Sequence, residues 1–324
     1  DPCVKSGKFE FLNSKGIASW ADEQSLTPTA PMLERYMPFL MTPKKFIALL
    51  FISVVLLLSL TLLGGHSIGH DIKFLIASLA YYAFTTYSLG LVKTNKEILL
   101  TVLIIILPPS AILMPFHIID YKETQIAFLS TLGHYLGVLF GILTHFTKQK
   151  VKFLSGIILV AISVWTSFVG YNYWLHKVNF GTFTGKAYDQ SPGQLLGLNQ
   201  FGQKITDETF KNKLVVLDFW HTRCGVCFQK FPLLQILYDK YRLDTTIKIV
   251  AVNRPLKQDT IGQAFSMLQS RGYNFPILIP SIDSLPEKYK VTSYPTTIVI
   301  DKSGNIIYRG EIENVNPVIT KVLK

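Results

Sequence analysis

Two of the chain's three cysteines, Cys224 and Cys227, stand two residues apart in the segment FWHTRCGVCFQKFP at 219–232. Thiols at this spacing can exchange electrons as a dithiol and a disulfide, hold a metal ion with further ligands, or cross-link the fold. The third cysteine, Cys3, is far from them in the sequence, and we expect it to be an incidental free thiol.

The residues around the pair favour electron exchange. A zinc site needs four ligands, and the only histidine after residue 176 is His221, so we expect no metal. A disulfide that closes so short a ring removes little entropy from the unfolded chain, and it would contribute little as a cross-link. A redox pair needs its first cysteine at a helix N-terminus, where unpaired backbone N–H groups stabilise a thiolate.

The predicted elements provide that position. The apolar run KLVVLDFW at 213–220 predicts a strand buried on both faces, and the spacing of Phe231, Leu234 and Leu237 predicts a helix just after the cysteines. Further along the chain we predict strands at 246–253 and 275–280, a helix at 259–271, two strands joined by a Ser-Gly-Asn turn within 295–312, and a last helix from about Val315. This order predicts an α/β sandwich with a mixed central sheet.

The motifs carry a family resemblance. LDFWHTRCGVC, followed about 70 residues later by SYPTT, resembles the thioredoxin superfamily. The preceding segment LLGLNQFGQKITDETFKNK resembles its membrane-anchored, extracytoplasmic TlpA/ResA-like branch. The resemblance covers roughly residues 191–324 and no part of the predicted membrane helices.

The resemblance implies roles for particular residues. Cys224 would be the exposed nucleophile, Cys227 the resolving thiol, and Pro295 a cis-proline whose neighbouring backbone lines the substrate groove. Asp218 matches the buried carboxylate that assists proton transfer to the resolving cysteine; a solvated aspartate at a strand end is the alternative. The residues implied for the groove are Trp220, Tyr294 and Thr296.

Departures from the family pattern leave the direction of electron flow open. Gly225-Val226 replaces the usual Gly-Pro, Arg223 the usual Trp, and Lys230 the usual acidic residue. Cations near a thiol stabilise the reduced pair, so Arg223 and Lys230, with His221 as a weaker candidate, would make the couple more oxidising. An ordinary solvated surface position is the alternative for all three residues. Thr222 precedes Cys224 by two positions, unlike the Thr-x-x-Cys of thioredoxin-fold peroxidases, which disfavours that activity. Dithiol exchange itself requires no metal or organic cofactor.

The other half of the chain is too apolar to be soluble. The sequence is 49% hydrophobic and 16% charged, and the apolar residues concentrate before residue 176. Crossing a membrane takes about 20 apolar residues. Runs of that length lie at 46–65, 72–92, 98–119, 125–146 and 153–175. They predict an α-helical transmembrane domain of about five helices.

Two features predict how these helices pack. The third run contains prolines that predict a kink or a discontinuity: Pro108, Pro109 and Pro115. The fourth run carries glycines on one face that allow another helix to approach closely: Gly133, Gly137 and Gly141. Together they indicate a packed bundle.

Basic residues in the short loops predict the orientation. The side expected to be cytoplasmic holds Arg35, Lys44, Lys45, Lys93, Lys96, Lys148, Lys150 and Lys152, and the other side holds Lys73, Lys122 and Lys177. We therefore predict a cytoplasmic or interfacial segment at 1–43, a membrane domain at 44–176, a linker at 177–190 and a thioredoxin-like domain at 191–324. The membrane would be the bacterial cytoplasmic (inner) membrane, with the last domain periplasmic or extracellular. The net charge of +11 comes partly from these loops and partly from a basic soluble domain, so no nucleic-acid partner is expected.

Several ionisable residues fall within or beside the membrane runs. His66, His70 and Asp71, and then His117 and Asp120, are expected at the outer side, and His134 lies within the fourth run. A metal, haem or quinone site could be built from such residues, but histidines that face lipid headgroups explain all except His134. We expect no cofactor site here.

Two functions remain open. The first is an enzyme, a membrane-tethered thiol-disulfide oxidoreductase that acts on protein clients with cysteines. Because residues 4–223 contain no cysteine, a separate thiol redox partner would have to recycle it. The second is an accessory subunit that binds other membrane subunits through the bundle and uses the thioredoxin fold for docking. The intact pair Cys224 and Cys227 favours the enzyme.

Overall fold

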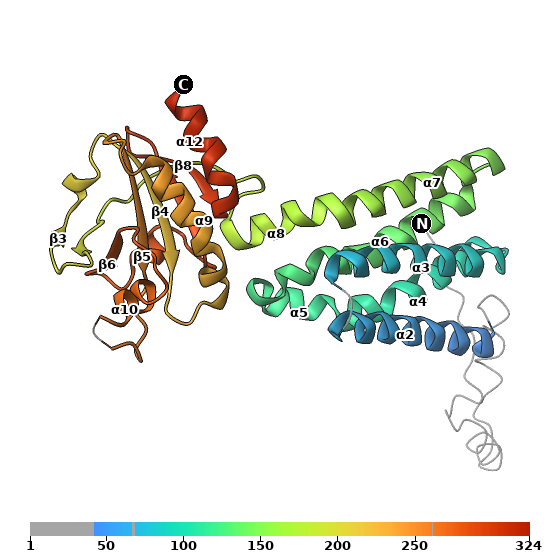
Figure 1. Cartoon of the computed structure of the whole chain (residues 1–324). Helices are drawn as coiled ribbons and strands as arrows, with labels where there is room; N and C mark the ends of the chain where they lie inside the picture. The colour runs from blue at the N-terminus through green and yellow to red at the C-terminus, as the bar shows by residue number, and fades with distance from the viewer. Residues whose placement is uncertain (1–41, 67–68, 261) are drawn as a thin grey trace, which may run out of the picture.

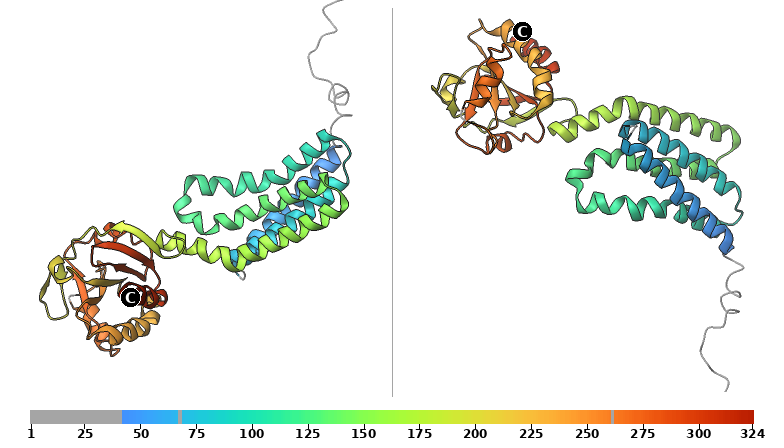
Figure 2. Two further views of the ribbon diagram at one scale, coloured as in Figure 1. Left: turned by 90° about the horizontal axis from the view of Figure 1, so that it is seen from above. Right: turned by 60° about the horizontal axis from the view of Figure 1, so that its bottom comes forward.

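The computed structural model describes residues 42–66, 69–260 and 262–324, which form a helical bundle and an α/β domain (Figure 1). A long helical segment, residues 149–180, leaves the bundle and leads into the α/β domain (Figure 1). The two further views show the same arrangement (Figure 2). Cys3 and nearly all of the predicted segment 1–43 lie outside the described residues.

The bundle contains helices over every predicted run. They are α2 (Pro43–His66), α3 (His70–Gly90), α4 (Asn95–Ile112), α5 (Met114–Ile119), α6 (Tyr121–Phe146), α7 (Gln149–Trp165), the π-helix η2 (Thr166–Gly170) and α8 (Tyr171–Phe180). Among the described residues, four stretches are long and apolar enough to cross a membrane: Pro43–Leu62, Asn95–Ile112, Tyr121–Phe146 and Gln149–Phe180. α3 is not among these four; its polar residues Ser78, Thr85 and Ser88 are buried inside the bundle.

The predicted discontinuity in the third run is confirmed. α4 contains Pro108 and Pro109 and ends at Ile112, and α5 has Pro115 in its first turn. A proline has no backbone N–H to donate, which disrupts a helix interior but costs little in a first turn.

The predicted close approach of helices is also confirmed, between α6 and α3. A Cβ atom at Gly137 would lie 2.3 Å from the carbonyl oxygen of Ser78, and one at Gly141 would lie 2.6 Å from Cβ of Thr85. Gly133 faces the same helix, where a Cβ would lie 2.9 Å from the carbonyl oxygen of Phe74. Side chains at these positions would force the two backbones apart.

The α/β domain has the predicted mixed sheet. Its strands are β1 (Lys186–Gln190), β2 (Gly197–Leu198), β3 (Lys204–Ile205), β4 (Leu214–Trp220), β5 (Ile247–Asn253), β6 (Ile277–Pro280), β7 (Thr296–Ile300) and β8 (Asn305–Gly310). They form one eight-stranded sheet in the order β1-β8-β7-β4-β5-β6-β2-β3. β4 pairs with β5, and β5 with β6, in parallel; the other pairs are antiparallel.

Helices cover both faces of this sheet. The domain's helices are α9 (Gly225–Tyr241), α10 (Gln263–Gln269), α11 (Leu285–Lys288) and α12 (Val315–Leu323), with short 3-10 turns η3 (Asp207–Thr209) and η4 (Ile312–Asn314). Successive residues of a strand point to opposite faces. The even-numbered apolar residues of β4 pack with α9, α10 and α12, whereas the odd-numbered ones pack on the other face with α11.

The boundary between the two parts differs from the predicted linker at 177–190. α8 continues to Phe180, and β1 already begins at Lys186. β1 pairs with β8, with Lys186 opposite Tyr308. The last five residues of the predicted linker therefore belong to the sheet.

Candidate active site

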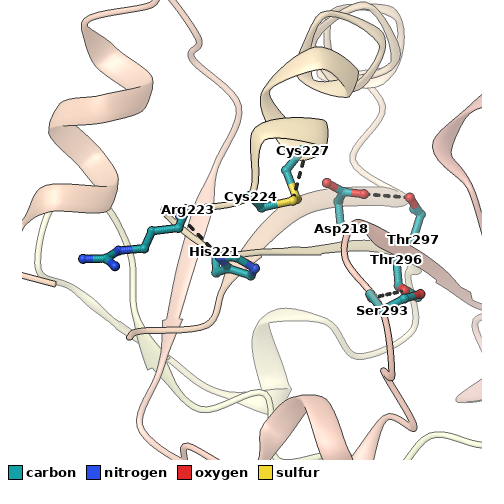
Figure 3. The surroundings of a disulfide bond; sticks show 8 residues. All are labelled: Asp218, His221, Arg223, Cys224, Cys227, Ser293, Thr296 and Thr297. Carbon is teal, nitrogen blue, oxygen red and sulfur yellow. Dashed lines mark hydrogen bonds between the residues drawn. A yellow bond between two sulfur atoms is a disulfide. The ribbon is translucent and has the colours of Figure 1, made fainter. Parts of the chain in front are cut away.

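Cys224 and Cys227 form a disulfide at the N-terminus of α9 (Figure 3). Cys224 is the N-cap residue, and its Sγ accepts a hydrogen bond from the backbone N–H of Cys227, with an N···Sγ distance of 3.1 Å. Cys224 is 7% exposed, whereas Cys227 is fully buried at 0%. A reacting sulfur from another molecule therefore reaches Cys224 and not Cys227.

This position also favours a thiolate on Cys224. The first turn of a helix has backbone N–H groups without helical partners, and the helix dipole places positive potential there. Both stabilise a negative sulfur and lower the pKa of a thiol. The strand-to-helix junction predicted from the sequence thus positions the more accessible cysteine for nucleophilic attack.

Asp218 is a buried carboxylate on the face of β4 that α9 covers. Its even number places it on the same side as Val216 and Trp220, which share a core cluster with both cysteines. Thr297, its partner in β7, donates a hydrogen bond from Oγ1 to Oδ1 of Asp218 at 2.7 Å (Figure 3). Burial raises the pKa of Asp218 to about 7, although the hydrogen bond from Thr297 works in the opposite direction. The alternative of a solvated aspartate is wrong.

The loop before β7 contains the predicted cis-proline. The Tyr294–Pro295 peptide bond is cis, and Tyr294 is partly exposed. The Tyr294 ring makes an edge-to-face contact with the imidazole of His221, with centroids 5.1 Å apart. The guanidinium of Arg254 lies over the same Tyr294 ring, with its carbon 6.0 Å from the ring centroid.

Two of the three predicted groove residues turn inward instead. Trp220 is 0% exposed and packs edge-to-face on Phe228 and Phe231, because it lies on the face of β4 covered by α9. Thr296 is also buried, and its Oγ1 donates to the carbonyl oxygen of Ser293 at 2.6 Å. Of the predicted set, Tyr294 alone offers side-chain surface to a substrate.

The three residues predicted to affect the redox potential of the cysteine pair differ in their surroundings. Arg223 is exposed, and its side chain points away from the sulfurs in Figure 3. Lys230 forms an ion pair with Glu313 of η4, which offsets its charge. Burial and then the charge of Arg254 lower the pKa of His221, which favours the neutral imidazole. A redox-tuning role for these residues stays a prediction.

Some residues that shape the site gave no signal in the sequence. Thr297 is identified only by its pairing with Asp218 across two strands, and Glu313 only by its ion pair. Thr222 donates to Oδ1 of Asp259 at 2.6 Å, which fastens the turn before Cys224 to the loop after β5. Strand alternation and the register between β4 and β7 could have found Thr297, but the other contacts depend on the tertiary fold.

The histidines of the bundle bind hydroxyl and carbonyl groups. His117 hydrogen-bonds the hydroxyls of Thr124 and Thr131 at 3.1 and 3.0 Å, and His134 hydrogen-bonds the carbonyl oxygen of Thr131 at 3.0 Å. His70 begins α3, whereas the side chain of His66 lies outside the described part of the chain. Within that part, no three His, Cys, Asp or Glu side chains gather closely enough to hold a metal ion.

The sheet order, the dithiol at the start of α9 and the cis-proline loop together define a class of protein, the thioredoxin-like thiol-disulfide oxidoreductases. Comparison with known proteins gives the same result for the C-terminal part of the chain. Residues 185–309 match the AhpC/TSA family.

Three similar proteins illustrate the relationship. The thioredoxin-like protein YneN of Bacillus subtilis (strain 168) is 30% identical over 156 residues, which are 48% of this chain and 86% of YneN. The thiol-disulfide oxidoreductase ResA of the same organism is 27% identical over 164 residues, 49% of this chain and 84% of ResA. A solved structure of a putative thiol:disulfide interchange protein DsbE from Chlorobium tepidum matches 44% of this chain and 100% of its own at a TM-score of 0.38 and 24% identity. The chain belongs to the thioredoxin superfamily, and it is a thiol-disulfide oxidoreductase.

Proposed function

We propose that the protein is tethered in the bacterial cytoplasmic (inner) membrane and exchanges disulfides with protein clients on the extracytoplasmic side. The observation that carries this proposal is the placement of Cys224 as the N-cap of α9, with Cys227 buried behind it. Val226 is 51% exposed beside the pair and, with Tyr294, offers apolar surface to a polypeptide. Protein clients are therefore better matched to this surface than small polar thiols.

The exchange proceeds in two steps. The thiolate of Cys224 attacks one sulfur of a client disulfide, which forms a mixed disulfide and releases the other client sulfur as a thiolate. Cys227 then gives its proton to the carboxylate of Asp218 and attacks the sulfur of Cys224. This step forms the Cys224–Cys227 disulfide and releases the second client thiolate. Two electrons pass to the client, and the reverse sequence oxidises a client dithiol.

The bundle supports the membrane location. The four apolar stretches are long enough to cross a membrane. Because α3 runs beside α6 in direct contact, we propose that α3 crosses the membrane as well. Its polar side chains face other helices and not lipid. Five crossings, together with the excess of loop lysines at the end of the bundle away from the α/β domain, support a position of Cys224 outside the cytoplasm.

A separate thiol redox partner recycles the pair. Residues 4–223 contain no cysteine, so electrons cannot pass through the bundle by thiol exchange within this chain. The partner must reach Cys224, the accessible sulfur, as a client does.

Trapping of the mixed disulfide tests the proposal. In Cys227→Ala, the second step has no attacking thiol, so the full-length protein expressed in cells should accumulate disulfide adducts of discrete mass that a reductant removes. The variant Cys224→Ala/Cys227→Ala is the matched control and should form none. Absence of adducts in Cys227→Ala, with a wild-type phenotype for the double variant, would contradict the proposal and favour an accessory subunit.

A further inference from the structure

A cavity of about 590 Å³ lies between the bundle and the α/β domain. Its charged and amide side chains come from three parts of the chain: Lys122 and Gln125 of α6, Lys186 and Asp189 of β1, and Lys290 and Arg309 of the α/β domain. Figure 1 shows that α8 connects the two parts in this region. The cavity is thus formed by the membrane helices and the redox domain together.

The cavity carries an excess of positive charge. Asp189 is the one carboxylate among its lining residues, which include four cations. Both of its oxygens are engaged: Lys290 Nζ donates to Oδ1 at 3.0 Å, and Arg309 Nη2 donates to Oδ2 at 3.0 Å. These two hydrogen bonds hold the pKa of Asp189 below its ordinary value, so it stays ionised. Lys122 and Lys186 add two further positive charges that Asp189 does not offset.

Arg309 supplies a second, independent feature. It is 3% exposed, and its Nε has no hydrogen-bond partner among the described residues. A buried donor without an acceptor destabilises the fold, so such donors are usually satisfied by protein, water or ligand. The planar guanidinium matches the oxygens of a phosphate group particularly well.

The position of the cavity relative to the bundle indicates the source of such a group. Lys122 and Gln125 lie in the first two turns of α6. At the same level, Trp174 Nε1 donates to the carbonyl oxygen of Gln125 at 2.8 Å, and the Tyr171 hydroxyl donates to that of Ile126 at 2.9 Å. Trp and Tyr are enriched where a membrane meets water, which is where lipid phosphates are concentrated.

We propose that this cavity binds the phosphate group of an anionic phospholipid of the outer leaflet. The phosphate oxygens accept hydrogen bonds from the ammonium groups of Lys122 and Lys186, and the guanidinium of Arg309, which lines the same cavity, adds positive charge beside them. Because the lining residues belong to both parts of the chain, the bound headgroup fastens the α/β domain to the membrane surface. The inference relies on the proposed membrane location but not on the redox chemistry.

Lipid binding to the oxidised, full-length protein in detergent tests the inference. Native mass spectrometry compares dioctanoyl phosphatidylglycerol with dioctanoyl phosphatidylcholine, whose choline cation offsets its phosphate. Glycerol 3-phosphate and inorganic phosphate are added as competitors without acyl chains. The test variant is Lys122→Gln/Lys186→Gln, since both side chains are exposed and the fold should tolerate the change. The matched control, Lys44→Gln/Lys150→Gln, removes two exposed charges from the opposite end of the bundle.

We expect phosphatidylglycerol to bind at least about tenfold more tightly than phosphatidylcholine, and the test variant alone to lose this preference. Displacement by both competitors would support recognition of the phosphate group. Equal binding of the two lipids, or an unchanged preference in the test variant, would overturn the inference. Tight binding of inorganic phosphate without any lipid preference would assign the cavity to a free anion and overturn the lipid source. No thiol step is measured, so a negative result leaves the proposed exchange reaction standing.

Discussion

The two sulfurs of the disulfide differ in their surroundings, and this difference supports the roles proposed for them. Cys224 caps α9 and keeps the exposed surface of the pair, whereas Cys227 is sealed between the helix and the sheet. Asp218 lies on the sheet face below that helix. We therefore propose nucleophilic attack by Cys224 and assisted proton loss by Cys227.

Substitution of Asp218 tests the proton-transfer step. Asp218→Asn removes the acceptor but keeps the size and the hydrogen bond from Thr297, so we expect the release of a model client from the mixed disulfide to slow by at least about tenfold. The wild-type rate should rise with pH through about 7, as Asp218 ionises, and the variant should lack this rise. Rapid-mixing kinetics at several pH values measure both. An unchanged rate and pH profile would exclude the role.

The stability of the oxidised protein gives a second readout of the same carboxyl. The pKa of Asp218 is about 7 in the folded state, above the ordinary 3.8, so the folded state holds an extra proton between these values. Protonation of Asp218 therefore contributes to the free energy of unfolding. This contribution is fully present below pH 3.8 and is lost as the pH rises through about 7. Between these two pKa values, the free energy of unfolding falls by up to about 1.4 kcal/mol per pH unit. Asp218→Asn should flatten that part of the profile in denaturant titrations.

The ion pair of Lys230 leads to a prediction about the redox potential. Lys230 lies one helical turn after Cys227, and Glu313 offsets its charge. Glu313→Gln should free this charge, stabilise the reduced pair and raise the potential by the order of 10 mV. The double variant Lys230→Gln/Glu313→Gln should have a redox potential close to that of the wild type. Equilibration with glutathione buffers measures the potentials.

An ion pair on the protein surface provides the control for the Glu313 and Lys230 variants. Glu208 and Lys211 also form an ion pair, but both are largely exposed and lie near η3. Glu208→Gln should leave the potential unchanged. A potential that fell in Glu313→Gln, or moved equally in Glu208→Gln, would show that Lys230 does not act on the thiols.

Sequence motifs identify those site residues whose chemistry is local. The C-x-x-C spacing and the strand before it place Cys224 at a helix N-terminus, and the SYPTT segment marks Pro295. Trp220 could not be placed in the same way. A residue at a strand end faces either a groove or the core, and only the packing of α9 on β4 decides which.

At the level of elements, the glycines of α6 allow this helix to pack closely on α3. Gly137→Ala would put a Cβ 2.3 Å from the carbonyl oxygen of Ser78, so the helices must separate. We expect a loss of about 1–3 kcal/mol in stability. Thermal unfolding in detergent measures it. In the control Gly90→Ala, the new Cβ meets no atom within 4 Å, and little change is expected. Equal unfolding temperatures for the two variants would contradict the contact.

Long apolar runs make the bundle helices predictable, because lipid requires both length and hydrophobicity. β1 was not predictable on these grounds. Its sequence KAYDQ contains one buried residue, Ala187, and it joins the sheet at an edge beside β8. An edge strand needs little apolar sequence, so a polar segment of this kind reads as a linker until its partner is known.

At the scale of the whole molecule, the end of α8 is hydrogen-bonded to the loop before Pro295. The carbonyl oxygen of Asn179, at the end of α8, accepts hydrogen bonds from Oγ1 of Thr292 at 2.8 Å and from Oγ of Ser293 at 2.9 Å. These residues directly precede the cis peptide bond before Pro295. More than 110 residues separate the partners in the chain, so no local pattern could have indicated this contact.

The proposed topology predicts opposite sides for two cysteines. An odd number of crossings separates Cys3 from Cys224, so a membrane-impermeant maleimide should label Cys224 in intact, mildly reduced cells. It should label Cys3 only after permeabilisation. The single-cysteine variants Cys3→Ala/Cys227→Ala and Cys224→Ala/Cys227→Ala make the two measurements separately. Labelling of both cysteines from the same side would contradict five crossings.

In the proposed reaction, Cys224 is the stabilised thiolate and Cys227 is its shielded partner. Alkylation of the reduced full-length protein, followed for each cysteine by mass spectrometry across pH, tests it most directly. We predict that Cys224 reacts first, with a pKa below the usual value of about 8.5, and that Cys227 reacts at least about tenfold more slowly at pH 7. A Cys224 pKa at or above that usual value, or faster reaction of Cys227, would contradict the account.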